Sequence, residues 1–251
     1  MKQAAMTGVL LVLAPCVLAQ ASEKSGGKSA DAMAVVNKAA AGLTRVKTVR
    51  YKADYVGTKW IATLVPRVSG LATVGSRSKY DVDPFFAEVT ITRQGEEGTE
   101  TSAQYKAGSD GNIYFLIDDE TKTVYEDMDP LVLGSNSRDI RRVLVPEFAD
   151  PKPLEDVQKA KSVGLLDNAM VDGVSCRVVS VETDQPPVVT YYFGEKDYLP
   201  RKIVRTYKND KGEEATTELT LHDVTPNPSF VRSPFEPVVP AGYTKTDEFA
   251  P

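Results

Sequence analysis

Apolar and polar residues alternate along most of this chain, which is the pattern of strands that bury one face. The clearest run is Val49, Tyr51, Ala53 and Tyr55, which alternate with charged residues. Further strand-like runs lie at Trp60–Val65, Val68–Val74, Ser78–Val82, Ala87–Arg93, Thr101–Ala107 and Ile113–Ile117. Gly- and Asp-rich turns separate them at 95–98, 108–111 and 118–122. Short strands at this spacing predict an antiparallel sheet rather than strand–helix–strand units.

The second half of the chain has the same pattern. Asp172-Gly173 is a strong signal for a tight hairpin, so we expect a positive φ at Gly173. Strands are predicted at Ser162–Ala169, Val174–Thr183, Val188–Phe193, Arg201–Tyr207 and Ala215–His222. The proline-rich tail from Pro226 to Pro240 is expected to be an ordered edge or coil. The pattern predicts about a dozen strands in all.

Two segments have helical spacing instead. The first spans 31–43, with Asp31 as its expected cap, Gly42 as its stop signal, and an apolar face of Ala32, Val35, Val36, Ala39 and Leu43. The second begins at Asp129-Pro130, because proline suits the first helical position. It runs to 148 and places Ile140, Val143 and Leu144 on one face. Two or three helices beside a large sheet predict an α+β fold.

The N-terminus has the layout of a secretory signal peptide over residues 1–21. Lys2 precedes an apolar core, and Ala19-Gln20-Ala21 offers small residues for cleavage before Ser22. A membrane anchor would need about 20 apolar residues, and Pro15 interrupts this core. Leu13-Ala14-Pro15-Cys16 resembles a lipobox, but Pro15 fits poorly there, so we expect no lipid on Cys16. Residues 22–30 are expected to be a flexible linker, and 31–251 one domain.

Composition and charge exclude several classes of function. Lys2 is the only charge in the signal segment, so cleavage changes the net charge from −5 to −6. A mildly acidic chain has no general attraction for nucleic acid or anionic headgroups. An exported protein lacks access to ATP and nicotinamide pools, and no cofactor is expected. Gly27-Lys28-Ser29 imitates the end of a phosphate-binding loop, but the required earlier glycine is Ser22 and no strand precedes it.

Candidate chemistry is sparse. Cys176 would be the one cysteine of the exported chain, which excludes an internal disulfide, and it is read as a small apolar strand residue. His222 is the only histidine, and no Gly-x-Ser-x-Gly elbow accompanies it. The acidic groups 118–120 and 126–129 do not match a calcium loop and are expected to be solvated turns. A catalytic function is therefore not expected, and a hydrolase ranks last.

Two groups of residues are candidates for binding. Large apolar side chains on predicted strands are either core or the lining of a cavity: Trp60, Phe85, Phe86, Phe115 and Tyr191. Arg138, Arg141 and Arg142 form a basic group beside apolar Ile140 and Val143. These arginines are either the solvated face of a short helix or the rim of a pocket that receives an anionic headgroup. No metal ligands are expected.

The C-terminal half carries a family resemblance in the order and spacing of its short motifs. These are Asp172-Gly173-Val174-Ser175-Cys176-Arg177-Val178-Val179, Tyr191-Tyr192-Phe193-Gly194, Leu199-Pro200-Arg201-Lys202, Tyr207, Leu221-His222-Asp223-Val224, Asn227-Pro228, Phe235 and Pro240-Ala241-Gly242. This succession, over residues 160–245, resembles a bacterial periplasmic family of uncharacterised function. That family is similar to the LolA/LolB lipoprotein-carrier superfamily.

The resemblance implies a single curved antiparallel sheet, a half-open barrel with its helices packed on the concave side. In lipoprotein carriers that concavity holds acyl chains. It also implies an exported, non-catalytic protein in the periplasm or outside the cell, which binds or carries lipid or lipoprotein acyl chains. The helix at 31–43 or the segment 129–148 would then be a movable cover. The alternative is a protein-binding or envelope-sensor module on the same fold, because the superfamily contains both.

Overall fold

The structure of the protein is a computed structural model, and it describes residues 27–76, 83–95 and 98–247. The expected signal peptide, most of the linker and the strand predicted at 78–82 lie outside these residues. Twelve strands form one sheet: β1 (Thr48–Gly57), β2 (Arg67–Gly75), β3 (Phe85–Gln94), β4 (Glu100–Ser109), β5 (Tyr114–Asp118), β6 (Thr123–Asp127), β7 (Ser162–Val171), β8 (Val174–Glu182), β9 (Val188–Gly194), β10 (Pro200–Lys208), β11 (Glu214–Pro226) and β12 (Thr244–Thr246).

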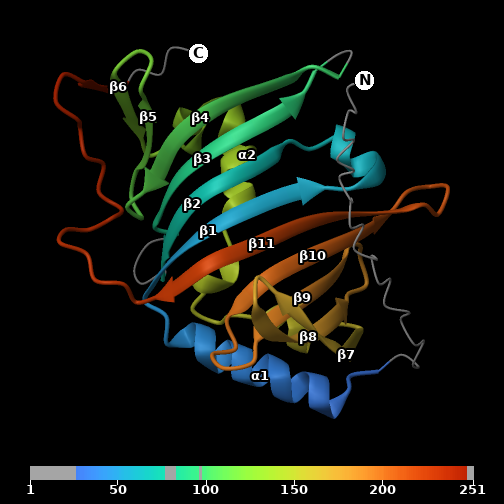
Figure 1. The fold of residues 1–251 in the computed structure, drawn as a ribbon. Helices are drawn as coiled ribbons and strands as arrows, with labels where there is room; N and C mark the ends of the chain where they lie inside the picture. The colour runs from blue at the N-terminus through green and yellow to red at the C-terminus, as the bar shows by residue number, and fades with distance from the viewer. Residues whose placement is uncertain (1–26, 77–82, 96–97, 248–251) are drawn as a thin grey trace, which may run out of the picture.

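The strand order is β12-β6-β5-β4-β3-β2-β1-β11-β10-β9-β8-β7, and the sheet does not close. Neighbouring strands are antiparallel except for β12 and β6, which run parallel. The sheet is strongly curved, and β1 joins its N-terminal and C-terminal halves through β11 (Figure 1). The predicted single curved antiparallel sheet with few helices is therefore confirmed.

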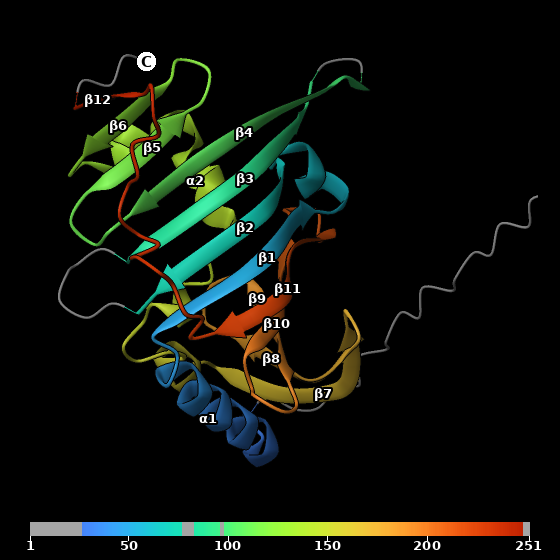
Figure 2. The same cartoon turned by 60° about the vertical axis from the view of Figure 1, so that its left-hand side comes forward.

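The helices lie mainly on one face of the sheet. They are α1 (Ala30–Thr44), α2 (Ser137–Ile140), α3 (Glu155–Gln158) and the 3₁₀ helices η1 (Lys59–Thr63), η3 (Pro130–Asn136), η4 (Arg141–Val143) and η5 (Pro146–Phe148). Figure 2 shows α2 behind the sheet while the C-terminal tail crosses its front, so the tail lies on the opposite face. We call the face under α1 and α2 concave and the face under the tail outer. Among the described helices, none has both the length and the apolar character to cross a bilayer.

The first helix forms where the apolar spacing predicts it, but its ends differ from the prediction. The Ser29 hydroxyl, not Asp31, accepts the capping hydrogen bond from the Ala32 N–H (3.4 Å). Gly42 does not stop the helix, which continues to Thr44. A Cβ at Gly42 would lie 2.9 Å from the Asp197 carbonyl oxygen, so this glycine permits close packing against the β9–β10 turn. The buried face is the predicted one, Ala32, Val35, Val36, Ala39 and Leu43.

The predicted Asp172-Gly173 hairpin is confirmed. Both residues have positive φ, 47° at Asp172 and 75° at Gly173, and the turn joins β7 to β8. Asp118 also forms the expected turn, because its carboxylate accepts hydrogen bonds from the N–H groups of Glu120 and Thr121. These short-range predictions succeed because turn chemistry is local.

Several elements differ from the prediction. Trp60–Val65 is not a strand: Lys59, which has a positive φ of 49°, begins the 3₁₀ helix η1. β6 was missed because Glu126 and Asp127 suggest a solvated turn, whereas Glu126 is buried and paired with Lys245. The tail contributes β12, whose pairing with β6 no local pattern indicates. The segment from 130 to 148 is a chain of single turns rather than one helix, with a break at Gly134.

Candidate functional site

The concave face of the sheet is apolar across most of its width. Alternate residues of each strand point into it, as the burial pattern of β1 illustrates. The inward set includes Val49, Tyr51, Ala53, Val68, Ala72, Val74, Phe85, Ala87, Val89, Ile91, Ile203, Leu219 and Leu221. Such a surface is stable only when something covers it.

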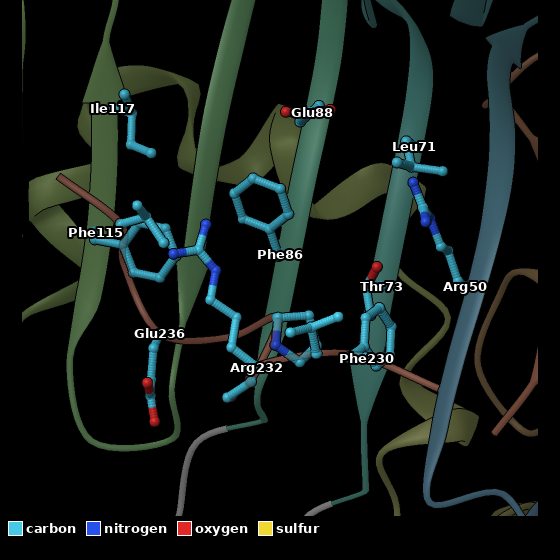
Figure 3. A pocket seen from close by; sticks show the side chains of 14 residues that line it. Arg50, Leu71, Thr73, Phe86, Glu88, Phe115, Ile117, Phe230, Arg232 and Glu236 are labelled. Carbon is cyan, nitrogen blue, oxygen red and sulfur yellow. The ribbon is translucent and has the colours of Figure 1, made fainter. Parts of the chain in front are cut away.

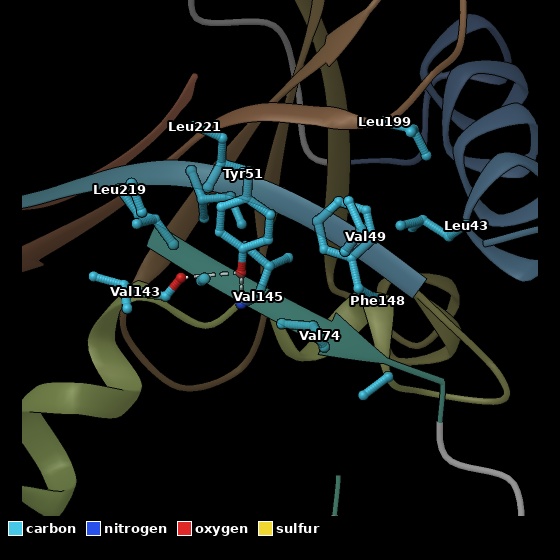
Figure 4. Close-up of a cluster of buried hydrophobic side chains, with 14 of the residues drawn as sticks. Leu43, Val49, Tyr51, Val74, Val143, Val145, Phe148, Leu199, Leu219 and Leu221 are labelled. Carbon is cyan, nitrogen blue, oxygen red and sulfur yellow. Dashed lines mark hydrogen bonds between the residues drawn. The ribbon is translucent and has the colours of Figure 1, made fainter. Parts of the chain in front are cut away.

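Residues 130–149, which we call the cover, pack on this face together with α1. The cover begins as its sequence predicts: the Asp129 carboxylate accepts from the Leu131 N–H (2.8 Å), and Pro130 occupies the first turn. Its buried side chains are Val132, Leu133, Ile140, Val143, Val145, Phe148 and Ala149. The cover fills the concave face with its own side chains, as Figure 4 shows around Val143, Val145 and Phe148.

Tyr51 holds the middle of the cover. Its hydroxyl donates to the Val143 carbonyl (3.0 Å) and accepts from the Val145 N–H (3.1 Å), as Figure 4 shows. Burial raises the pKa of Tyr51 far above its ordinary value, so the hydroxyl stays protonated and can make both bonds. The Phe148 ring lies 5.8 Å from the Tyr51 ring, centroid to centroid. One side chain of β1 therefore fixes both η4 and η5.

The three predicted arginines belong to the cover but do not act alike. Arg142 donates to the carboxylate of Asp139 (2.8 Å) and to the hydroxyl of Tyr55 (2.8 Å), so it is committed to structure. Arg93 of β3 also binds Asp139 (2.6 Å), which ties the cover to the sheet. Arg141 is exposed and lies over the Tyr114 ring at 5.5 Å. Arg138 is exposed at the edge of a shallow hollow that Arg93 and Arg142 also line.

The five predicted lining residues do not meet in one cavity. Phe85 and Tyr191 belong to the core on the concave face, where the Tyr191 hydroxyl donates to Glu147 (2.8 Å). Burial and the Glu147 carboxylate both raise the pKa of Tyr191. Phe86 and Phe115 line a groove on the outer face. Trp60 lies in η1, and its Nε1 donates to the Glu213 carbonyl (3.3 Å).

Strand parity separates these residues. Consecutive residues of a strand point to opposite faces, so Phe85 and Phe86 cannot line the same surface. The residues that hold the cover were not predicted: Tyr51, Tyr55, Arg93, Asp139 and Glu147. The alternating pattern of the predicted strand makes Tyr51 and Tyr55 inward-facing residues. Their hydroxyl partners, however, are about 90 residues away in sequence.

The groups with potential reactivity are structural in character. Cys176 is fully buried, and burial raises the pKa of its thiol, which disfavours the reactive thiolate. Within the described ranges, no group of three or more His, Cys, Asp or Glu side chains is placed to hold a metal ion. Ser29 of the loop-like Gly27-Lys28-Ser29 serves as the cap of α1.

His222 lies on β11 between two carboxylates. Its Nδ1 is 2.9 Å from Asp172 and its Nε2 is 2.9 Å from Asp54. Hydrogen bonds to Asp172 and then Asp54 raise the pKa of His222. The neighbouring Asp223 is paired with Lys52, which lowers the pKa of Asp223. The imidazolium, which can donate from both nitrogens, is therefore the form that the fold stabilises.

Because the pKa of His222 is raised in the folded state, the contribution of His222 to the free energy of unfolding depends on pH. The stabilisation by His222 should be complete below the unfolded pKa of about 6.5 and lost as the pH rises through the folded pKa. We expect His222→Gln to lower the free energy of unfolding more at pH 5.5 than at pH 8.5, measured by urea denaturation. Lys52→Gln, on the same face, does not titrate in this window and should cost the same at both values. An equal loss at both pH values for His222→Gln would contradict the assignment.

One family model matches part of the chain, and solved structures are similar to its fold. Residues 142–247 match the family described as "Predicted periplasmic protein (DUF2092)". No curated protein sequence matches the chain. The structure is similar to LprF from Mycobacterium bovis, with a TM-score of 0.54 at 10% identity over 84% of this chain and 100% of that one.

Two further solved structures have lower scores. The Mycobacterium tuberculosis lipoprotein LppX has a TM-score of 0.43 at 11% identity, over 80% of this chain and 98% of that one. The Pseudomonas aeruginosa MucA/MucB complex has a TM-score of 0.42 at 12% identity, over 83% of this chain and 62% of the matched one. The family match and the likeness to LprF confirm the resemblance expected from the C-terminal half, at the level of the fold.

Proposed function

We propose that this protein is an exported, non-catalytic binder of molecules with a long acyl chain, and that the concave face is the binding site. The observation that carries the proposal is the nature of the cover. A wide apolar surface is closed by single-turn helices, which are held by a few polar contacts from Tyr51, Arg93 and Tyr191. Short elements with few contacts of their own open more readily than long packed helices.

Magnitudes limit how far the cover can move. An acyl chain of about 15 methylenes gains at most about 12 kcal/mol on burial, and association costs about 4–15 kcal/mol. Each large apolar side chain of the cover that leaves the core forfeits about 1.5–3 kcal/mol. The free energy lost by displacing the whole cover would therefore exceed the free energy gained by burying the acyl chain. The ligand must replace only η4 and η5, the part that Tyr51 holds.

An anionic headgroup would then meet Arg138 and Arg141, which are the exposed members of the arginine group. Arg142 is excluded from that role by its bonds to Asp139 and Tyr55. No reaction is assigned to the bound molecule, because Cys176 is buried and His222 is held between two carboxylates away from the concave face. The description of the matched family supports a place in the periplasm.

The test is Tyr51→Phe, which removes both hydrogen bonds to the cover and little else. Leaving the Val145 N–H and Val143 C=O without partners should lower the free energy of unfolding by about 1–3 kcal/mol. Because the closed cover loses that energy while the open cover does not, binding of a fluorescent fatty-acid analogue should tighten, by about tenfold per 1.4 kcal/mol. Stability is measured by urea denaturation and binding by fluorescence titration.

The control is Ile61→Val, at a buried residue of η1 outside the core cluster of the concave face, which should cost about 0.5–1.5 kcal/mol. It should leave the affinity for the analogue unchanged. The proposal fails if Tyr51→Phe loses stability with no gain in affinity, or if neither wild type nor Tyr51→Phe binds the analogue saturably at micromolar protein.

A second candidate, binding of an envelope protein, rests on β7. Among the residues that the structure describes, β7 pairs with β8 and otherwise makes a single bridge, between Lys28 and Val163. It exposes Leu165, Leu166 and Met170, the last at 65%. An edge strand with exposed apolar side chains can pair with an extended segment of another protein. Cross-linking from position 170 in the envelope, with and without Leu166→Lys, tests this candidate: a cross-linked partner that Leu166→Lys abolishes supports it, and no cross-linked partner contradicts it.

A further inference from the structure

The outer face of the sheet carries a groove of about 380 Å³, formed without any movement of the cover. Its floor follows one register row across five strands: Arg50, Thr73, Phe86, Gly108 and Phe115 are successive cross-strand partners. Because Gly108 has no side chain, the Phe86 and Phe115 rings stack across it, with centroids 6.1 Å apart. Leu71 and Ile117 extend the apolar floor into the next row.

The roof of the groove is residues 228–242, which we call the strap. One end is held by the side-chain amide oxygen of Asn227, Oδ1, which accepts from the Lys47 N–H (2.7 Å). The other end is held by β12 and by the Tyr243 hydroxyl, which donates to Asp119 (2.8 Å). Between these ends the Phe235 ring packs against Gly75. The strap is thus fixed at both ends and crosses the outer face between them. Its residues Phe230, Val231 and Val238 line the groove beneath it.

The charged side chains around the groove differ in whether they have a hydrogen-bond or ion-pair partner. Within the described part of the chain, neither Arg50 nor Arg232 has an ion pair or a side-chain hydrogen bond, and both line the groove. Glu88 lies opposite Lys106 in the register of β3 and β4, while the ammonium of Lys106 pairs with Asp119 at 2.7 Å. Figure 3 shows that Glu236 points away from Arg50 and Arg232, and that the Phe86 ring lies between these two arginines. Two guanidinium groups without partners thus flank an aromatic floor, which complements an anion with an apolar body.

We propose that this groove is a second binding site, and that it takes one amphipathic carboxylate whose hydrocarbon chain lies on Phe86, Phe115 and Phe230. Its carboxylate binds Arg50 or Arg232. The volume lies within the range of about 300–1,000 Å³ typical of small-ligand pockets. The site does not depend on the function proposed for the concave face, because the sheet itself separates the two surfaces.

The experiment is calorimetric titration of the purified protein with dodecanoate, and with dodecyltrimethylammonium as a ligand of the same chain and opposite charge. We expect one saturable groove site for dodecanoate, counted separately from any binding beneath the cover, and no saturable binding of dodecyltrimethylammonium. The double variant Arg50→Gln/Arg232→Gln should weaken it at least tenfold, since charge-assisted hydrogen bonds are lost. Both arginines are exposed, so the variant should fold, which circular dichroism and an unchanged melting temperature would verify.

The outcomes separate this site from the concave face. Tyr51→Phe should leave binding in the groove unchanged, whereas it should tighten binding beneath the cover. Dodecanoate binding that responds to Tyr51→Phe and not to the arginine variant would overturn the groove and support the concave site. Equal binding of the cationic ligand, or no saturable binding of dodecanoate, would also overturn the groove.

Discussion

Gly108→Val is expected to lower the free energy of unfolding by about 3–5 kcal/mol. A Cβ at this position would lie 2.4 Å from Cζ of Phe115 and 2.6 Å from the carbonyl oxygen of Phe85. The carbonyl belongs to the neighbouring strand and cannot retreat without breaking the sheet. Overpacking alone costs about 1–3 kcal/mol, and expelling the buried Phe115 ring adds about 1.5–3 kcal/mol. Urea denaturation followed by circular dichroism measures the loss.

Gly164→Val is the matched control. Gly164 is also a strand glycine, but nothing lies within 4 Å of an added Cβ there. Valine favours strands more than glycine does, so this variant should be neutral or slightly stabilised. If Gly108→Val were as stable as Gly164→Val, the stacked arrangement of Phe86 and Phe115 across Gly108 would be wrong.

The sequence predicts the sheet because each strand carries its own evidence. The alternation from Val49 to Tyr55 shows which side chains of β1 are buried, and the Asp172-Gly173 turn joins β7 to β8. Those signals are local, and they do not say which strand lies beside which. The contact between β1 and β11 joins residues about 170 positions apart, and the parallel pairing of β12 with β6 has no local sign at all.

Local sequence signals predict even less of the candidate site than of the sheet. Aromatic residues on strands were recognised, but Phe86 and Phe115 lie on the outer face while Phe85 and Tyr191 lie on the concave one. The parity of Phe85 and Phe86 could have been read from the sequence. The role of Tyr51 could not, because a tyrosine at an inward strand position is ordinary core until its hydroxyl partner is known. The segment 129–148 was expected to be helical, but it folds into short separate turns that resemble neither a helix nor a loop in sequence.

Phe148→Ala is expected to have opposite effects on stability and on ligand binding. Phe148, the last residue of η5, is 2% exposed and packs on Tyr51. Truncating a buried phenylalanine costs about 3–5 kcal/mol, part of which is the cavity that remains. Here the cavity would lie on the concave face, where an acyl chain could fill it without displacing the cover. The fluorescent fatty-acid analogue should therefore bind more tightly than to wild type, and it should raise the melting temperature of the variant more than that of wild type.

Phe115→Ala provides the comparison, because it is the same truncation at a residue that is 1% exposed on the other face. It should lose a similar free energy of unfolding, about 3–5 kcal/mol. It removes part of the floor beneath the strap while the cover stays closed. It should therefore weaken dodecanoate binding in the groove and leave the analogue on the concave face unaffected. If both variants changed both ligands in the same direction, a general loosening of the fold would explain the result better than two separate sites, because the sheet would then no longer keep the two faces independent.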